Sequence, residues 1–154
     1  MKVVIQRVKK ASVIADGMHS GACGQGLLLL LGVAKGDEAL DADLLADKIA
    51  KLRIFSDENG KMNRSVLDIG GEILVVSNFT LLANYAHGNR PDYFEGASPD
   101  VANALYEHFV SVLKEKIPHV ETGVFGADMQ IDAVCDGPVT IWMESEKLRK
   151  GKNA

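Results

Sequence analysis

Three polar side chains fall within four residues of the segment SNFTLLA at 77–83, where an apolar run ends. Ser77, Asn78 and Thr80 could supply a nucleophile or hydrogen-bond donors to a reacting group. A hydroxyl nucleophile needs a base, and the nearest candidate along the chain is His87; no G-x-S-x-G motif or Ser/His/Asp order is evident. The alternative interpretation is that these polar residues end a strand and cap a turn.

The segment CDGPVT at 135–140 is informative because of its backbone. A Gly-Pro pair interrupts two alternating segments, although proline removes a ladder donor and glycine weakens a strand. An X-Pro bond takes the cis form at modest cost, so Gly137 and Pro138 could aim two carbonyl oxygens in one direction as a rigid acceptor pair. The alternative is a turn or bulge in an edge strand.

The segment NYAHGNRPDYFEG at 84–96 is too long and too polar for a simple connection, which is typical of a binding loop. Arg90 in this loop could meet a phosphate or a carboxylate, or it could simply be soluble surface. The glycine-rich GACGQG at 21–26 matches neither G-x-G-x-x-G nor G-x-x-x-x-G-K-[ST], so a nucleotide site there is not expected.

The sequence predicts neither a metal nor another cofactor. The four histidines are scattered, with no H-x-x-x-H pair, and the two cysteines lack C-x-x-C or Cys/His ligand spacing, so we expect free thiols. These residues are His19, His87, His108, His119, Cys23 and Cys135.

The net charge of −4 and the pI near 5.5 argue against a protein that coats nucleic acid through its overall charge. Basic residues nevertheless concentrate in RVKK at 7–10 and KLRKGK at 147–152. These runs are either solvated surface or local patches that touch a few phosphates.

The longest apolar stretch, at 26–34, is far shorter than the ~20 residues that cross a bilayer, and MKVVIQRVKK lacks the features of a signal peptide. We therefore expect a cytoplasmic protein with no membrane partner. A chain of 154 residues that is 47% hydrophobic has the size and composition of one globular domain, spanning 1–154.

Alternating strand and helix patterns indicate an α/β domain in which two helices cover one side of a mixed sheet. About half of the sheet faces then need another layer. The Asp16-Gly17 pair predicts a hairpin turn, and Ser98 with Pro99 marks a helix start. The expected strands are 2–8, 11–15, 18–23, 27–33, 73–77, 129–135 and 139–143, and the expected helices are 41–55 and 99–117.

Several motifs together resemble the D-aminoacyl-tRNA deacylase family, over the chain to about residue 145. They are QRVKKASV near the start, SNFTL at 77–81, HGNRP in the long loop, TGVFGADMQ at 122–130 and CDGPVT at 135–140. The family patterns are usually written SQFTL and N-x-GPVT, so this chain departs from them at Asn78 and Cys135. Both departures fall in active-site motifs and bear on hydrogen bonding and substrate range.

The resemblance implies a homodimer with a three-layer α/β/β arrangement and an active site at the subunit interface. Gly137 and Pro138, joined by a cis bond, would enter the partner's pocket and exclude L side chains. The implied reaction is hydrolysis of the ester of D-aminoacyl-tRNA at its acceptor end. Glycyl-tRNA(Ala) would also be a substrate, because glycine has no side chain to exclude.

The resemblance also assigns roles to single residues. Catalytic residues would be Ser77, Asn78, Phe79 and Thr80, and substrate-binding residues would be Arg7, Phe125, Met129, Gly137 and Pro138. Either the 2′-hydroxyl of the terminal ribose assists the attack while the backbone N–H groups of Phe79 and Thr80 stabilise the oxyanion, or Thr80 attacks directly. Two other functions remain open: a non-catalytic dimeric module that binds an RNA end or an amino acid, and a general Thr-dependent esterase.

Overall fold

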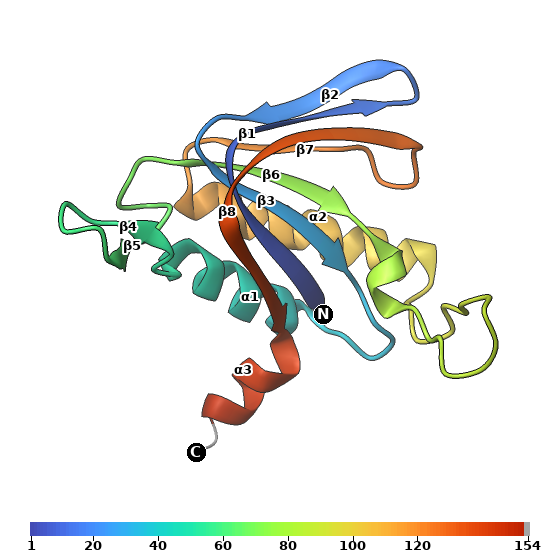
Figure 1. The fold of residues 1–154 in the computed structure, drawn as a ribbon. Coiled ribbons are helices and arrows are strands. Elements are labelled where there is room, and N and C mark those ends of the chain that lie inside the picture. Colours follow the sequence, from blue (N-terminus) through green and yellow to red (C-terminus); the bar gives the residue numbers. More distant parts are fainter. Residues whose placement is uncertain (153–154) are drawn as a thin grey trace.

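The structure, a computed structural model, describes residues 1–152. Asn153 and Ala154, which belong to the expected domain of 1–154, lie outside the described residues. Figure 1 shows helices α1 and α2 beneath one face of a twisted mixed sheet. The elements in chain order are β1 (Lys2–Ala15), β2 (Met18–Cys23), β3 (Gly26–Gly32), α1 (Ala39–Lys51), β4 (Phe55–Ser56), β5 (Met62–Arg64), β6 (Glu72–Ser77), the 3-10 helix η1 (Phe79–Leu82), α2 (Pro99–Lys116), β7 (Val120–Thr122), β8 (Met129–Glu144) and α3 (Ser145–Lys152).

Strand β1 is the centre of the sheet because three other strands pair with it. Its first half pairs with β3, its second half with β2, and β8 pairs with it from Lys2 to Ala15. The two expected strands 2–8 and 11–15 are therefore one strand, with irregular register against β8 around Val8. The predicted hairpin turn is confirmed, since Asp16 and Gly17 adopt φ values of 48° and 81°.

The leucine run of β3 has apolar partners on both faces, so the predicted strand is buried on both sides of the sheet. Leu27, Leu29 and Leu31 point into the large core formed with α1 and α2. Leu28 and Leu30 point into a smaller core on the opposite face, built by the second half of β1 with β2 and β6. The sheet is thus covered by helices on one side and by its own curled strands on the other, which gives the expected three layers.

The sheet curls because β2 approaches β7. The Ser20 hydroxyl donates to the Thr122 carbonyl at 2.9 Å, and the Ala22 N–H donates to the Glu121 carboxylate at 2.6 Å. A Cβ at Gly21 would lie 2.6 Å from the Thr122 carbonyl oxygen, so only glycine permits this approach.

Both predicted helices form, with corrected limits. The first ends at Lys51 and not at residue 55, because Leu52 is extended and Phe55 pairs in the β4–β5 hairpin, which was not predicted. The second begins at Pro99 after Ser98 as predicted. Its buried face includes Tyr106 and Phe109, whereas Val101 is 49% exposed.

The C-terminal region differs from the expectation in two ways. The segments 129–135 and 139–143 form one continuous strand, β8, and a third helix, α3, follows it, so the expectation of two helices was wrong. Periodicity does not signal α3, because it docks through the apolar side chain of Leu148 and through Arg149, which forms ion pairs with Asp41 on α1 and with Glu38 just before α1. None of the helices in residues 1–152 is long and apolar enough to cross a membrane.

Asp41 is the acidic partner that holds α1 and α3 together. Its side chain is buried and accepts hydrogen bonds from the Arg149 guanidinium at 2.8 and 2.5 Å and from the Glu38 N–H at 2.8 Å. Burial raises the pKa of Asp41, but the hydrogen bonds from Arg149, Glu38 and Ser145 outweigh it, and the pKa lies below its ordinary value.

We expect Asp41→Asn to lower the free energy of unfolding by about 2 kcal/mol at pH 7, because Arg149 and the Glu38 N–H lose a charged acceptor. Since the folded-state pKa is depressed, this contribution is present above the unfolded pKa near 3.9 and is lost as the pH falls through the folded value. Urea unfolding from pH 7 down to pH 3 measures it. Glu115→Gln, an exposed neutralisation on α2, is the control and should change stability by less than ~0.5 kcal/mol; an equal loss in both variants would contradict the assignment.

Candidate active site

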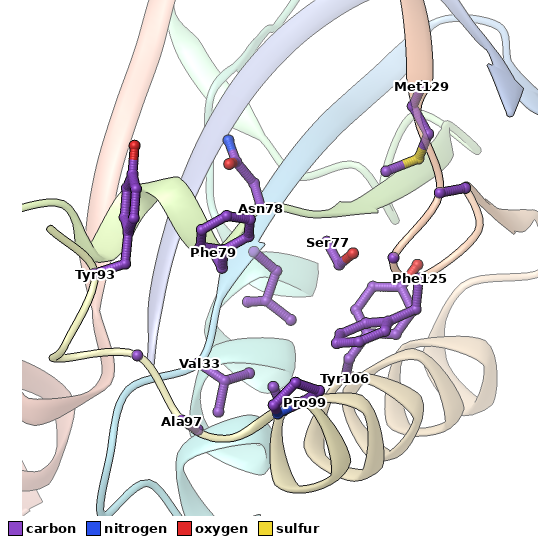
Figure 2. A pocket seen from close by; sticks show the side chains of 15 residues that line it. Val33, Ser77, Asn78, Phe79, Tyr93, Ala97, Pro99, Tyr106, Phe125 and Met129 are labelled. Carbon is purple, nitrogen blue, oxygen red and sulfur yellow. The ribbon is translucent and has the colours of Figure 1, made fainter. Parts of the chain in front are cut away.

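A cavity of about 470 Å³ opens where the parallel strands β3 and β6 end. Crevices at the carboxyl ends of parallel strands are common ligand sites. Figure 2 shows its walls, which come from four stretches of the chain, 31–33, 77–79, 93–106 and 125–129. The lining residues are Leu31, Val33, Ser77, Asn78, Phe79, Tyr93, Gly96, Ala97, Pro99, Ala102, Tyr106, Phe125, Gly126, Ala127 and Met129.

Two aromatic pairs form opposite parts of the wall (Figure 2). Phe79 meets Tyr93 edge-on, with ring centroids 4.9 Å apart, and Tyr106 lies 6.0 Å from Phe125. Phe125 reaches the cavity from the turn 124–127, where the Ala127 N–H donates to the Val124 carbonyl and Gly126 adopts a φ of 78°. The mostly apolar wall suits a ligand with a variable side chain and few fixed polar contacts.

The polar end of the cavity is a turn organised by Asn78. Its N–H donates to the Leu31 carbonyl at 2.8 Å, which extends the β3–β6 ladder by one residue. Its side-chain oxygen accepts the Thr80 N–H at 3.2 Å and also accepts the Thr80 hydroxyl. This is an Asx-turn, in which a short amide side chain fixes the start of η1.

The same contacts bear on the two expected mechanisms. The Thr80 hydroxyl donates to an amide oxygen, which cannot remove its proton, and His87 lies exposed in the long loop with no bond to Thr80. Of the two expected oxyanion donors, the Thr80 N–H is already paired with Asn78, whereas the Phe79 N–H has no acceptor among residues 1–152. One backbone donor is therefore free at the mouth of the cavity.

Tyr106 supplies a hydroxyl at the base of the cavity. This hydroxyl donates to the Val75 carbonyl at 3.1 Å, and the same oxygen also accepts the Gly123 N–H at 3.0 Å. Burial raises the pKa of Tyr106 to about 12. The phenol is therefore neutral near pH 7 and cannot serve as a general base there.

Gly137 and Pro138 lie outside this cavity, on the exposed part of β8. The peptide bond between them is cis, as expected from the sequence. A Cβ at Gly137 would lie 2.4 Å from the Val139 nitrogen, so no side chain fits there without a shift of the backbone.

Arg7 connects this segment to the rest of the fold. Its Nε donates to the Asp136 carbonyl at 3.0 Å and lies 3.3 Å from the Asp136 carboxylate, and its Nη1 donates to the Ile54 carbonyl at 2.7 Å. Through these contacts Arg7 braces the Gly-Pro segment.

The structure thus divides the predicted site residues into two groups. Ser77, Asn78, Phe79, Phe125 and Met129 line the cavity and Thr80 adjoins it, whereas Arg7, Gly137 and Pro138 form a second group elsewhere on the same chain. Sequence reasoning missed Tyr93 and Tyr106. Tyr93 lies in the loop predicted to bind ligand. Tyr106 precedes the buried Phe109 by three positions on α2, so helical spacing could have indicated Tyr106. Within residues 1–152, no cluster of His, Cys, Asp or Glu could hold a metal ion.

Comparison with known proteins gives consistent matches over nearly the whole chain. A family model described as D-Tyr-tRNA(Tyr) deacylase matches residues 4–144. A D-aminoacyl-tRNA deacylase from Anaeromyxobacter dehalogenans is 57% identical, over 96% of this chain and 99% of the relative. Another from Thermomicrobium roseum is 53% identical, over 98% of each.

A solved structure described as "c-Myc DNA Unwinding Element Binding Protein" superposes with a TM-score of 0.88. It is 39% identical and covers 94% of this chain and 98% of its own. Together the matches define an enzyme, a hydrolase of ester bonds. The chain belongs to the D-aminoacyl-tRNA deacylase family.

Proposed function

We propose that this enzyme hydrolyses the ester bond of D-aminoacyl-tRNA and releases the free D-amino acid and tRNA. The observation that carries the proposal is the cavity at the ends of β3 and β6, which offers a free backbone N–H at Phe79 and no side-chain nucleophile paired with a base. Such a site positions an ester and leaves the activation to the substrate. We place this activity in the cytoplasm, where aminoacyl-tRNA is made and used.

In the proposed reaction, water attacks the carbonyl carbon of the ester, assisted by the neighbouring 2′-hydroxyl of the terminal ribose. The Phe79 N–H donates to the oxygen that becomes negative, and this stabilises the tetrahedral intermediate. The bond from the carbonyl carbon to the 3′-oxygen then breaks, and the proton lost by the water is returned to that oxygen. Thr80 and Asn78 hold the turn that presents the donor and do not form a bond to the substrate.

Selectivity in this proposal comes from exclusion by the partner subunit. The carbonyl oxygens of Gly137 and Pro138 would enter the partner's cavity and occupy the direction that an L side chain must take once the amino group and ester are fixed. A D side chain points elsewhere, and glycine has none, so glycyl-tRNA(Ala) would also be cleaved. Because backbone atoms do the excluding, the device serves many different D side chains.

The surface of β8 supports the homodimer that this arrangement needs. Ile131, Val134 and Trp142 are 40–45% exposed on this strand, which pairs only with β1 within residues 1–152. Apolar side chains gathered on an exposed strand indicate a protein interface. Gly137 and Pro138 lie within the same strand, so a partner that covers it would also receive the Gly-Pro pair.

The decisive experiment compares D- and L-tyrosyl-tRNA as substrates of the same preparation. We expect the enzyme to release D-tyrosine with a kcat/KM at least ~100-fold above that for the L form. Tight binding of the D form with no loss of ester would favour the binding module. Equal cleavage of both forms, or cleavage of small activated esters that contain no RNA, would favour the general esterase.

The role of Thr80 is tested by its alanine and serine variants. Because the Thr80 hydroxyl donates to Asn78, we expect Thr80→Ala to keep deacylation within ~10-fold of the wild type, with a loss that reflects a looser turn. Single-turnover rates with D-tyrosyl-tRNA measure it. If Ala abolishes turnover while Ser preserves it, Thr80 is a nucleophile and the RNA-assisted mechanism is wrong.

Gly137→Ala tests the Gly-Pro pair. The new Cβ would lie 2.4 Å from the Val139 nitrogen, so the backbone of the Gly-Pro segment must shift. Because this moves the pair out of position, we expect kcat/KM for D-tyrosyl-tRNA to fall by about 100-fold while the fold is retained. Gly24→Ala is the matched control, since its Cβ would make an ordinary 3.5 Å contact with Glu72. Wild-type turnover in Gly137→Ala would show that the Gly-Pro pair is not part of the active site.

Complementation shows whether the pair acts across the interface. Ala127→Trp should fill the cavity from a surface turn, and this variant is co-expressed with Gly137→Ala. In a heterodimer, the open cavity of the Gly137→Ala chain receives the intact Gly-Pro pair of the Ala127→Trp chain, so one of the two sites is complete. Half of the dimers in a random mixture are heterodimers, so about a quarter of wild-type activity should return. No recovery would mean that cavity and pair act within one chain.

A further inference from the structure

A groove of about 570 Å³ runs between α1 and α3, and four of its nine lining residues are basic. We call it the α1–α3 groove; Figure 1 shows α3 leaving the end of β8 beside α1. Among the described residues that line it, Asp47 alone is acidic. The lining residues are Leu44, Asp47, Lys48, Lys51, Leu52, Arg53, Lys147, Leu148 and Gly151.

Much of this positive charge is available to a ligand. Among residues 1–152, no carboxylate pairs with Lys48, and Arg53 donates only to the neutral Asn63, at 2.9 and 2.6 Å. Lys51 and Lys147 form exposed pairs with near neighbours, Asp47 at 2.9 Å and Glu144 at 3.2 Å. Exposed pairs of this kind contribute at most about 1 kcal/mol, so an incoming phosphate can replace the carboxylate.

The positive groove stands out because the chain as a whole carries a net charge of −4. A local concentration of lysine and arginine on an acidic protein directs one face toward a polyanion, without attraction over the rest of the surface. Leu44, Leu52 and Leu148 form a floor on which extended lysine side chains can lie.

The groove is also linked to the Gly-Pro pair by a short chain of contacts. Arg53 in the groove precedes Ile54, whose carbonyl accepts the Arg7 guanidinium, and Arg7 in turn holds Asp136 next to Gly137. The subunit that supplies the Gly-Pro pair therefore carries the positive groove beside it.

We propose that the α1–α3 groove binds the sugar-phosphate backbone of the tRNA whose aminoacyl end lies in the partner subunit's cavity. This inference rests on the proposed function, because the cross-subunit site sets which groove faces the RNA. Phosphates near the acceptor end neutralise Lys48 and Lys147, and the basic C-terminal helix acts as part of the RNA-binding surface.

The experiment uses the full-length double variant Lys48→Ala/Lys147→Ala and two substrates. One is D-tyrosyl-tRNA and the other is the D-tyrosyl ester of adenosine, which retains the terminal nucleoside and lacks the RNA body. We expect KM for the tRNA to rise about 10-fold, so that the ratio of kcat/KM between tRNA and adenosine ester falls by the same factor. The slope of log(kcat/KM) against log salt should decrease by roughly 1.5, as expected for two lost phosphate contacts.

Lys114→Ala is the control, since it removes one exposed helical lysine outside the groove. An unchanged tRNA KM and salt slope in the double variant, or an equal change in Lys114→Ala, would overturn the proposal. Anisotropy of labelled, uncharged tRNA over the same salt range gives a second measurement, which does not depend on catalysis. A wild-type enzyme that binds this tRNA through the groove but cleaves neither ester would refute the proposed function and leave the groove supported.

Discussion

The pairing of β8 with β1 fixes the relation between the two groups of site residues. β1 also pairs with β3, the strand that ends at the cavity, so a single strand joins the Gly-Pro segment to the cavity-bearing sheet. Arg7 reinforces this connection from within β1 by donating to Asp136 on one side and Ile54 on the other. The position of Gly137 and Pro138 is therefore set by the central sheet, although both residues are exposed.

The cavity depends in turn on the burial of β3 and β6. Their leucines and valines pack against helices on one face and curled strands on the other, which holds their carboxyl ends in register. The hydrogen bond from the Asn78 N–H to the Leu31 carbonyl extends this register by one residue into the polar turn. A rigid scaffold thus presents a short polar turn, and this is a common construction of enzyme sites.

The sequence predicted the elements that have strong local signals. The Asp16-Gly17 turn and the Ser98-Pro99 helix start carry residue types that favour one backbone conformation. The leucine run of β3 is short and bounded by glycines, which favours a buried strand over a helix. α3 was missed because a long-range contact holds it, that of Arg149 with Asp41. The β4–β5 hairpin was missed because its strands have only two and three residues, too few to show an alternating pattern. The site was predicted as a set of residues, but single-chain patterns cannot show that Tyr106 and Tyr93 would close the same cavity from α2 and a loop.

Asn78 gives this chain a feature that the usual family pattern lacks. A glutamine side chain is one methylene longer and is poorly suited to the Asx-turn that Asn78 forms with Thr80. The conformation of η1 is consequently encoded by adjacent residues and is ready before any ligand arrives. The conformational entropy of this turn is lost when the protein folds and not when the substrate binds. The Phe79 N–H is therefore already held in place as a donor before binding.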